Sequence, residues 1–175
     1  GNREETEPEE DGPTPNADGT YTLKDYWGGD QGVKIAAPAG YELSPYSDDQ
    51  YLYFDAVLDR DYHYVSALYT LDRDYTEETM TDYYMEGMEY YRTDTDYSDL
   101  DIQEKKTVQV NGRDVSYVKC TYVYDEDNYY TEYCIWTFLP DGQVVQCEVE
   151  ESSYDGPCDI LDDGIVETVM SAVRG

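Results

Sequence analysis

Two dipeptides, Asn111-Gly112 and Asp141-Gly142, constrain the fold of this chain more than any other feature. Both central residues of a type I′ hairpin turn need positive φ, and Asn-Gly and Asp-Gly adopt it with the least strain. Runs of alternating apolar and polar residues flank both dipeptides. The pattern predicts four antiparallel strands over residues 102–110, 115–124, 130–139 and 144–149. An acidic loop at Asp125 to Asn128 joins the second strand to the third.

Further strands and two helices are expected around this meander. β-branched and aromatic residues indicate strands over residues 33–38, 51–58 and 62–71. A helix should begin near Thr76, which can cap it, and a second should run from about Asp159 to Arg174. The buried stripes would be Met80, Tyr84, Gly87, Met88 and Tyr91, and then Leu161, Ile165, Val169, Ala172 and Val173. These elements predict an α+β fold class, an antiparallel sheet with two main helices packed on it.

The core of such a fold must be built largely from tyrosine. The chain has a formal charge of −30 and few aliphatic residues, a combination typical of disorder, but it also has 22 Tyr and 2 Trp. A tyrosine buries a large ring while its hydroxyl stays at a wet edge, so we expect a folded body. The charge excludes nucleic acid as a partner and permits cationic peptides, divalent cations or basic protein surfaces, although acidity of this kind ordinarily serves solubility.

The first residues form a segment of different composition. Residues 2–18 contain no large apolar side chain and many acids and prolines, so residues 1–20 are predicted to be a disordered acidic tether and residues 21–175 a single α+β domain. The segment resembles the spacer that follows the lipidated cysteine of bacterial surface lipoproteins. We therefore expect a monomeric, extracytoplasmic protein at the cell surface, whose only membrane contact is an N-terminal lipid anchor.

The order of the expected elements resembles that of the PsbP-like family. An early strand is followed by the turn Pro38-Ala39-Gly40-Tyr41, a mid-chain helix, a four-strand meander and a closing helix, over about residues 21–174. The family tends to have an aromatic residue after Pro-x-Gly. The resemblance implies an antiparallel sheet with helices packed on it, used mostly by extracytoplasmic accessory and binding proteins, and it transfers no catalytic residue.

No residue pattern predicts a catalytic, cofactor or metal site. His63 is the only histidine, which excludes multi-histidine metal sites, and we expect an ordinary strand residue rather than a catalytic base. The acidic clusters lack the spacing of a calcium loop, and Asp94, Asp96 and Asp99 come nearest to it. The repeated pentapeptide LDRDY, at residues 58–62 and 71–75, is too short to indicate a repeat architecture.

The four cysteines allow three pairings when all are oxidised. We expect the cysteines of the meander to share one core face, with a two-residue loop at Asp141-Gly142 that places Trp136 opposite Cys147. Cys134 is then only diagonal to Cys147, whereas an odd-length loop near Asp125 can place Cys120 opposite Cys134. The predicted disulfides are Cys120–Cys134 and Cys147–Cys158, formed in an oxidising setting; the alternative is four buried thiols.

Two functions remain open on these observations. The first is a non-enzymatic binding or accessory module without a cofactor, whose ligand is a protein, peptide or glycan. The second is a hydrolase that uses two of the many carboxylates on an envelope or glycan substrate. Tyrosine doublets on the first helix, Tyr83-Tyr84 and Tyr90-Tyr91, could grip a ligand or simply cap the sheet. A pocket with two carboxylates, one with a raised pKa, would favour the enzyme.

Overall fold

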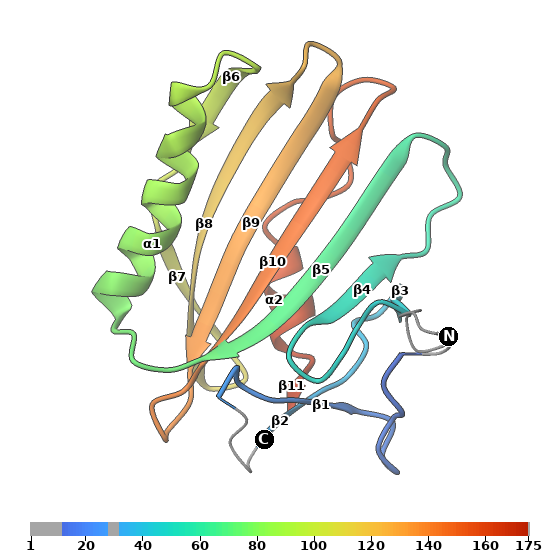
Figure 1. Ribbon diagram of the computed structural model, residues 1–175, viewed down its shortest axis with the longest axis vertical. Coiled ribbons are helices and arrows are strands. Elements are labelled where there is room, and N and C mark those ends of the chain that lie inside the picture. The colour runs from blue at the N-terminus through green and yellow to red at the C-terminus, as the bar shows by residue number, and fades with distance from the viewer. Residues whose placement is uncertain (1–11, 28–31, 175) are drawn as a thin grey trace, which may run out of the picture.

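The computed structural model describes residues 12–27 and 32–174, which form two antiparallel β-sheets and two α-helices (Figure 1). The large sheet has the strand order β3-β4-β5-β10-β9-β8-β6, and β7 pairs with β8 beside β6. Its strands are β3 (Tyr41–Leu43), β4 (Leu52–Ala56), β5 (His63–Asp72), β6 (Tyr97–Ile102), β7 (Lys106–Val110), β8 (Arg113–Tyr124), β9 (Asn128–Phe138) and β10 (Val144–Ser153). The small sheet contains β1 (Tyr21–Leu23), β2 (Val33–Ile35) and β11 (Val173–Arg174).

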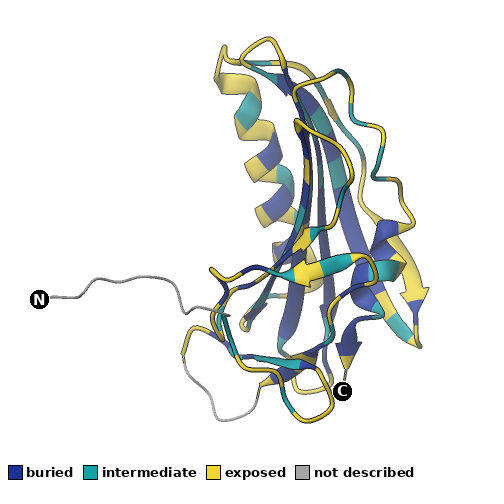
Figure 2. Ribbon diagram, turned by 90° about the vertical axis from the view of Figure 1, so that its right-hand side faces the viewer, coloured by how far each residue is buried: buried dark blue, intermediate teal, exposed yellow. Residues whose placement is uncertain are grey.

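The predicted α+β fold class is wrong, because this is a β-rich fold. Strands account for 44% of the described residues and helices for 14%. The two helices are α1 (Glu77–Glu89), which continues into the 3₁₀ turn η1 (Tyr90–Thr93), and the short α2 (Ile165–Met170). They lie on opposite sides of the large sheet (Figure 2), so the sheet, rather than a helical layer, organises both cores.

Helix α1 begins where the sequence predicts. The side chain of Thr76 accepts a hydrogen bond from the backbone N–H of Thr79, whose own side chain accepts one from the N–H of Thr76. This reciprocal capping box satisfies two backbone donors that would otherwise lack a partner. The residues that face the sheet are Met80, Tyr84 and Met88, whereas Gly87, expected on the same stripe, is exposed. They pack with Val118, Cys120, Cys134 and Trp136 in a core between α1 and strands β8 and β9.

The second core lies on the opposite face of the sheet. There α2 and the small sheet cover β5, β9 and β10, and the hydroxyl of Tyr69 fastens α2 by donating a 2.6 Å hydrogen bond to the carbonyl of Val169. The predicted helix over residues 159–174 is therefore mostly wrong, since only residues 165–170 are helical. Two tertiary contacts prevent a longer helix: the carboxylate of Glu151 binds backbone N–H groups of residues 159–161, and Val173 pairs with Ile35 of β2.

The meander is present, but its register differs from the predicted one. The Asn111-Gly112 turn joins β7 and β8 as expected, with both residues at positive φ. Strands β9 and β10 instead pair Phe138 with Val144, which leaves a five-residue connection around Asp141-Gly142. A two-residue turn would need an N–H from residue 140, and Pro140 has none. The N–H of Leu139 donates to the carbonyl of Gln143 in its place.

This register overturns the prediction that the cysteines share one face. Cys134 lies opposite Val118 and Glu148 and faces α1, whereas Cys147 lies opposite Ile135 and belongs to the α2 core. Cys120 pairs with Glu132 rather than with Cys134. The Sγ of Cys158 lies 3.6 Å from the carbonyl of Glu151, which is four residues, or about 13 Å, along β10 from Cys147. All four cysteines are free thiols in the structure.

The expected tether extends over residues that the structure describes only in part. Residues 1–11 lie outside the described residues. Within residues 12–20, the amide of Asn16 donates to the hydroxyl of Thr20, and Thr20 is buried. This stretch therefore packs against the start of β1. In the described ranges, no helix is long and apolar enough to cross a membrane.

Candidate binding site

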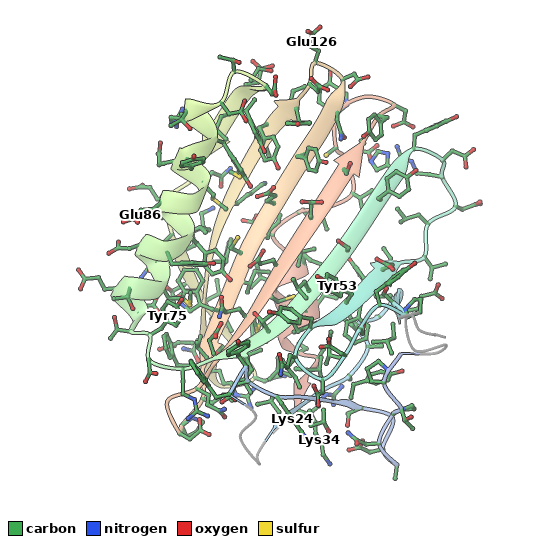
Figure 3. All side chains as sticks on the ribbon, in the orientation of Figure 1. Lys24, Lys34, Tyr53, Tyr75, Glu86 and Glu126 are labelled. Carbon is green, nitrogen blue, oxygen red and sulfur yellow. The ribbon has the colours of Figure 1, made fainter. Side chains whose placement is uncertain are left out.

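Helix α1 covers only part of its face of the large sheet. Side chains alternate along β10, so Val145, Cys147 and Val149 enter the α2 core while Gln146, Glu148 and Glu150 face the side of α1. The helix packs over β8 and β9, and no helix or strand of the described residues covers the neighbouring surface of β10, β5 and β4 (Figure 1). Tyr53, labelled in Figure 3, belongs to this open surface because it lies opposite Leu68, which in turn lies opposite Glu148.

Three glutamates meet on the open part of this face. Glu132 of β9 lies directly opposite Glu150 of β10, and Glu148 is two residues from Glu150 on the same side of its strand. In the described part of the chain, none of the three forms an ion pair with a lysine or arginine. Lys24 and Lys34, labelled in Figure 3, lie at the end of the molecule that holds the small sheet. Among the described residues, the sheet therefore holds adjacent carboxyl groups that lack a cationic partner.

Tyrosine rings enclose two of these carboxylates in a pocket of about 250 Å³. The rings of Tyr91 and Tyr97 stack with centroids 4.6 Å apart, and those of Tyr122 and Tyr130 stack at 5.0 Å. Tyr122 also contacts both rings of the first pair. The pocket is lined by Tyr91, Tyr97, Tyr122, Tyr124, Tyr130, Glu132 and Glu150.

A second pocket of about 230 Å³ contains the third glutamate. Glu148 accepts a 3.2 Å hydrogen bond from the hydroxyl of Tyr84, and the same hydroxyl contacts the side chain of Gln146. The pocket is lined by Tyr26, Gln50, Tyr51, Leu68, Thr70, Leu71, Asp72, Tyr83, Gln146 and Glu148. The two pockets adjoin through the neighbouring residues Glu148 and Glu150 of β10, and we refer to them together as the trough.

Hydrogen bonds fix the central carboxylate in place. The hydroxyl of Tyr91 donates to Oε1 of Glu132 at 2.9 Å, and the hydroxyl of Tyr122 donates to Oε2. Burial and the negative charge of Glu132 raise the pKa of both tyrosines, so these hydroxyls stay protonated and act as donors. The position of Glu132 is therefore set by the protein before any ligand arrives.

The pKa of each glutamate in the trough is raised. Burial, followed by repulsion from Glu132 and Glu148, raises the pKa of Glu150 to about 7. Burial also raises the pKa of Glu148, with a further contribution from Glu132, and burial raises that of Glu132 despite its tyrosine donors. The repulsion acts on the charged forms, so a cation placed in the trough would offset it.

His63 and its surroundings form a second cluster, on which the fold depends. Its Nε2 lies 2.8 Å from Oε2 of Glu151, and its Nδ1 lies 3.1 Å from Oδ1 of Asp155. Both His63 and Glu151 are buried. Each ring nitrogen of His63 therefore lies within hydrogen-bonding distance of a carboxylate.

A metal ion has little to bind at this cluster. His63, Glu151 and Asp159 each present a ligand atom within 4.8 Å of the others. Both oxygens of Glu151, however, already accept backbone N–H groups, from Asp159 at 2.9 Å and from Leu161 at 2.8 Å, with Ile160 donating to both. The carboxylate thus holds the segment after β10 in place.

In the acidic turn after α1, the carboxylate of Asp94 accepts a hydrogen bond from the backbone N–H of Asp96 and caps that turn.

The comparisons with known proteins do not name a family. No family model matches the sequence, and no curated protein matches it. A solved structure of similar shape is the protein of unknown function PA94 from Pseudomonas aeruginosa, with a TM-score of 0.42, 9% sequence identity, and coverage of 78% of this chain and 83% of that chain. At this distance the likeness carries no argument about function, which must come from the site itself.

Proposed function

We propose that this chain is a non-enzymatic binding module that holds a cationic ligand in the trough. One observation carries the proposal: Glu132, Glu148 and Glu150 adjoin on an open sheet face, among tyrosine rings, and no lysine or arginine of the described residues pairs with them. Like charges directly opposite on a sheet are destabilising, so a site that keeps them gains from a bound cation. The electron-rich faces of tyrosine rings attract the same ligands. The extracytoplasmic, lipid-tethered location belongs to the same proposal and is supported only by the resemblance of residues 2–18 to the spacer of surface lipoproteins.

A hydrolase acting through Glu132 and Glu150 is the alternative. Their shared pocket and the raised pKa of Glu150 favour it. The two residues, however, are cross-strand neighbours on one face, whereas glycoside hydrolysis needs an acid and a second carboxylate on either side of the scissile bond. Glu132 is also occupied by two tyrosine hydroxyls. The geometry suits charge recognition better than acid–base chemistry.

Calorimetric titration with choline and with its neutral isostere, dimethylbutanol, tests the proposal. We expect the wild-type protein to bind choline and not the alcohol, and the double variant Glu132→Gln/Glu150→Gln to lose choline binding. The variant Glu86→Gln removes one charge from an exposed position on α1 and is the control. Equal binding of the alcohol, or unchanged choline binding by the double variant, would refute the proposal. Turnover of chromogenic glycosides that the double variant abolishes would favour the hydrolase.

A further inference from the structure

We propose that the ligand of the trough is a linear polyamine, held by two ammonium groups, one in each pocket. This inference rests on the proposed function and specifies its ligand. The first pocket offers Glu132 and Glu150, and the second is lined by Glu148 and, farther along the strands, by Asp72. Each pocket is closed on part of its rim by tyrosine. Each can thus accept one positive charge on a slender chain.

The spacing of the two pockets sets the spacing of the charges. Glu148 and Glu150 are two residues apart on one side of β10, which corresponds to about 6.8 Å along an antiparallel strand. The ammonium groups of putrescine and spermidine span such a separation through their methylene chains. Leu68 of β5 lies opposite Glu148 and offers an apolar surface beside that path. The surface next to Glu148 is therefore apolar, which suits the methylene chain of a polyamine.

Other cations fit these observations less well. A divalent metal ion needs several oxygens converging at short range, and in the described residues the trough glutamates form no group of three ligand atoms within 4.8 Å of one another. A basic protein surface is a poorer match because each pocket encloses only about 230 to 250 Å³. A small, flexible, doubly charged molecule uses all three glutamates without requiring them to converge.

Calorimetric titrations with putrescine, spermidine and butylamine at pH 8 test the inference. We expect putrescine and spermidine to bind at least about tenfold more tightly than butylamine, which has a single charge. Glu148→Gln should weaken putrescine about tenfold while changing butylamine little, because the first pocket is intact. Glu86→Gln, which removes an exposed charge on the outer side of α1 (Figure 3), should leave both affinities unchanged.

Several results would overturn the polyamine. Equal affinity for putrescine and butylamine would mean that the second pocket does not contribute to binding. The polyamine inference would then be wrong, while the proposed function as a cation-binding module would stand. Binding of Mg²⁺ that is tighter than binding of spermidine would assign the trough to a metal ion. Binding of an oligolysine peptide under conditions where spermidine does not bind would assign it to a peptide. Retained putrescine affinity in Glu148→Gln would refute the two-pocket arrangement. Circular dichroism of each variant shows that the fold is intact.

Discussion

The replacement Glu150→Gln should stabilise the protein at alkaline pH and leave its stability unchanged in acid. The pKa of Glu150 is raised from 4.5 to about 7 in the folded protein, so the folded state binds this proton more tightly than the unfolded state. Stability therefore falls as the pH rises from about 4.5 to about 7, and the loss persists above that range. The groups that face Glu150 are Glu132 and Glu148 and the hydroxyls of Tyr91, Tyr122 and Tyr130, none of which neutralises it.

The size of the gain follows from the shift. A difference of roughly 2.5 pH units corresponds to about 3.4 kcal/mol at most. Because solvent reaches part of the side chain and screens the repulsion, we expect about 1–2 kcal/mol. Glutamine keeps the shape of the side chain, and within residues 12–27 and 32–174 Glu150 makes no side-chain hydrogen bond that the change would break, so the lost charge dominates.

Urea denaturation followed by circular dichroism measures this difference. The free energy of unfolding of Glu150→Gln should exceed that of the wild type by about 1–2 kcal/mol at pH 8 and match it at pH 4. Glu86→Gln controls for the general relief of a net charge of −30. The reasoning fails if Glu150→Gln destabilises the protein at pH 8, if its gain is the same at both pH values, or if Glu86→Gln gives an equal gain.

Three further predictions concern the scaffold. Glu151→Ala should lower the free energy of unfolding by about 3 kcal/mol or more, because it leaves His63 and the backbone N–H groups of residues 159–161 without their buried acceptor. Proteolytic cleavage confined to residues 157–164 would show that this segment has loosened, and full resistance to the protease would contradict the structural role of Glu151. All four cysteines should be alkylated after denaturation without reductant, and mass spectrometry counts the adducts. In the folded protein Cys158 should react slowly, since burial raises its pKa to about 11. A cross-linked pair of cysteines would show that the thiols are not free. Thr76→Ala should cost about 1 kcal/mol by removing the capping box of α1, whereas Thr76→Ser should cost little; equal losses in thermal denaturation would argue against capping.

Local signals predicted the parts of the fold that depend on neighbouring residues. The capping threonine and the apolar spacing placed α1, and Asn111-Gly112 placed a tight turn, because each depends only on a few adjacent positions. The register of β9 against β10 was missed although its cause is visible in the sequence, since Pro140 removes the donor that a two-residue turn requires. The second helix was overestimated because the competing partners of residues 159–174 come from β10 and β2.

The candidate site was not predicted, for a related reason. Glu148 and Glu150 alternate with buried residues of β10, and this pattern is typical of a solvated sheet face. Their proximity to Glu132 depends on the register, and the absence of a cover depends on where α1 packs. The signal that could have been used is the pair of glutamates at alternate positions of β10 beside a glutamate inside β9, combined with the tyrosine doublets of α1 and η1.

The pairing of β2 with β11 imposes an order on how the molecule can be made. Ile35 meets Val173 across about 140 intervening positions, and α2 can take its place only after residues 165–170 have been made. During synthesis on a ribosome, the α1 side of the sheet can assemble as soon as β10 has emerged, while the apolar face destined for α2 stays open until residues 165–174 have followed. Contacts of such long sequence separation form slowly and leave that face exposed to association with other chains. Factors that protect nascent proteins would thus be needed most for the face opposite the trough.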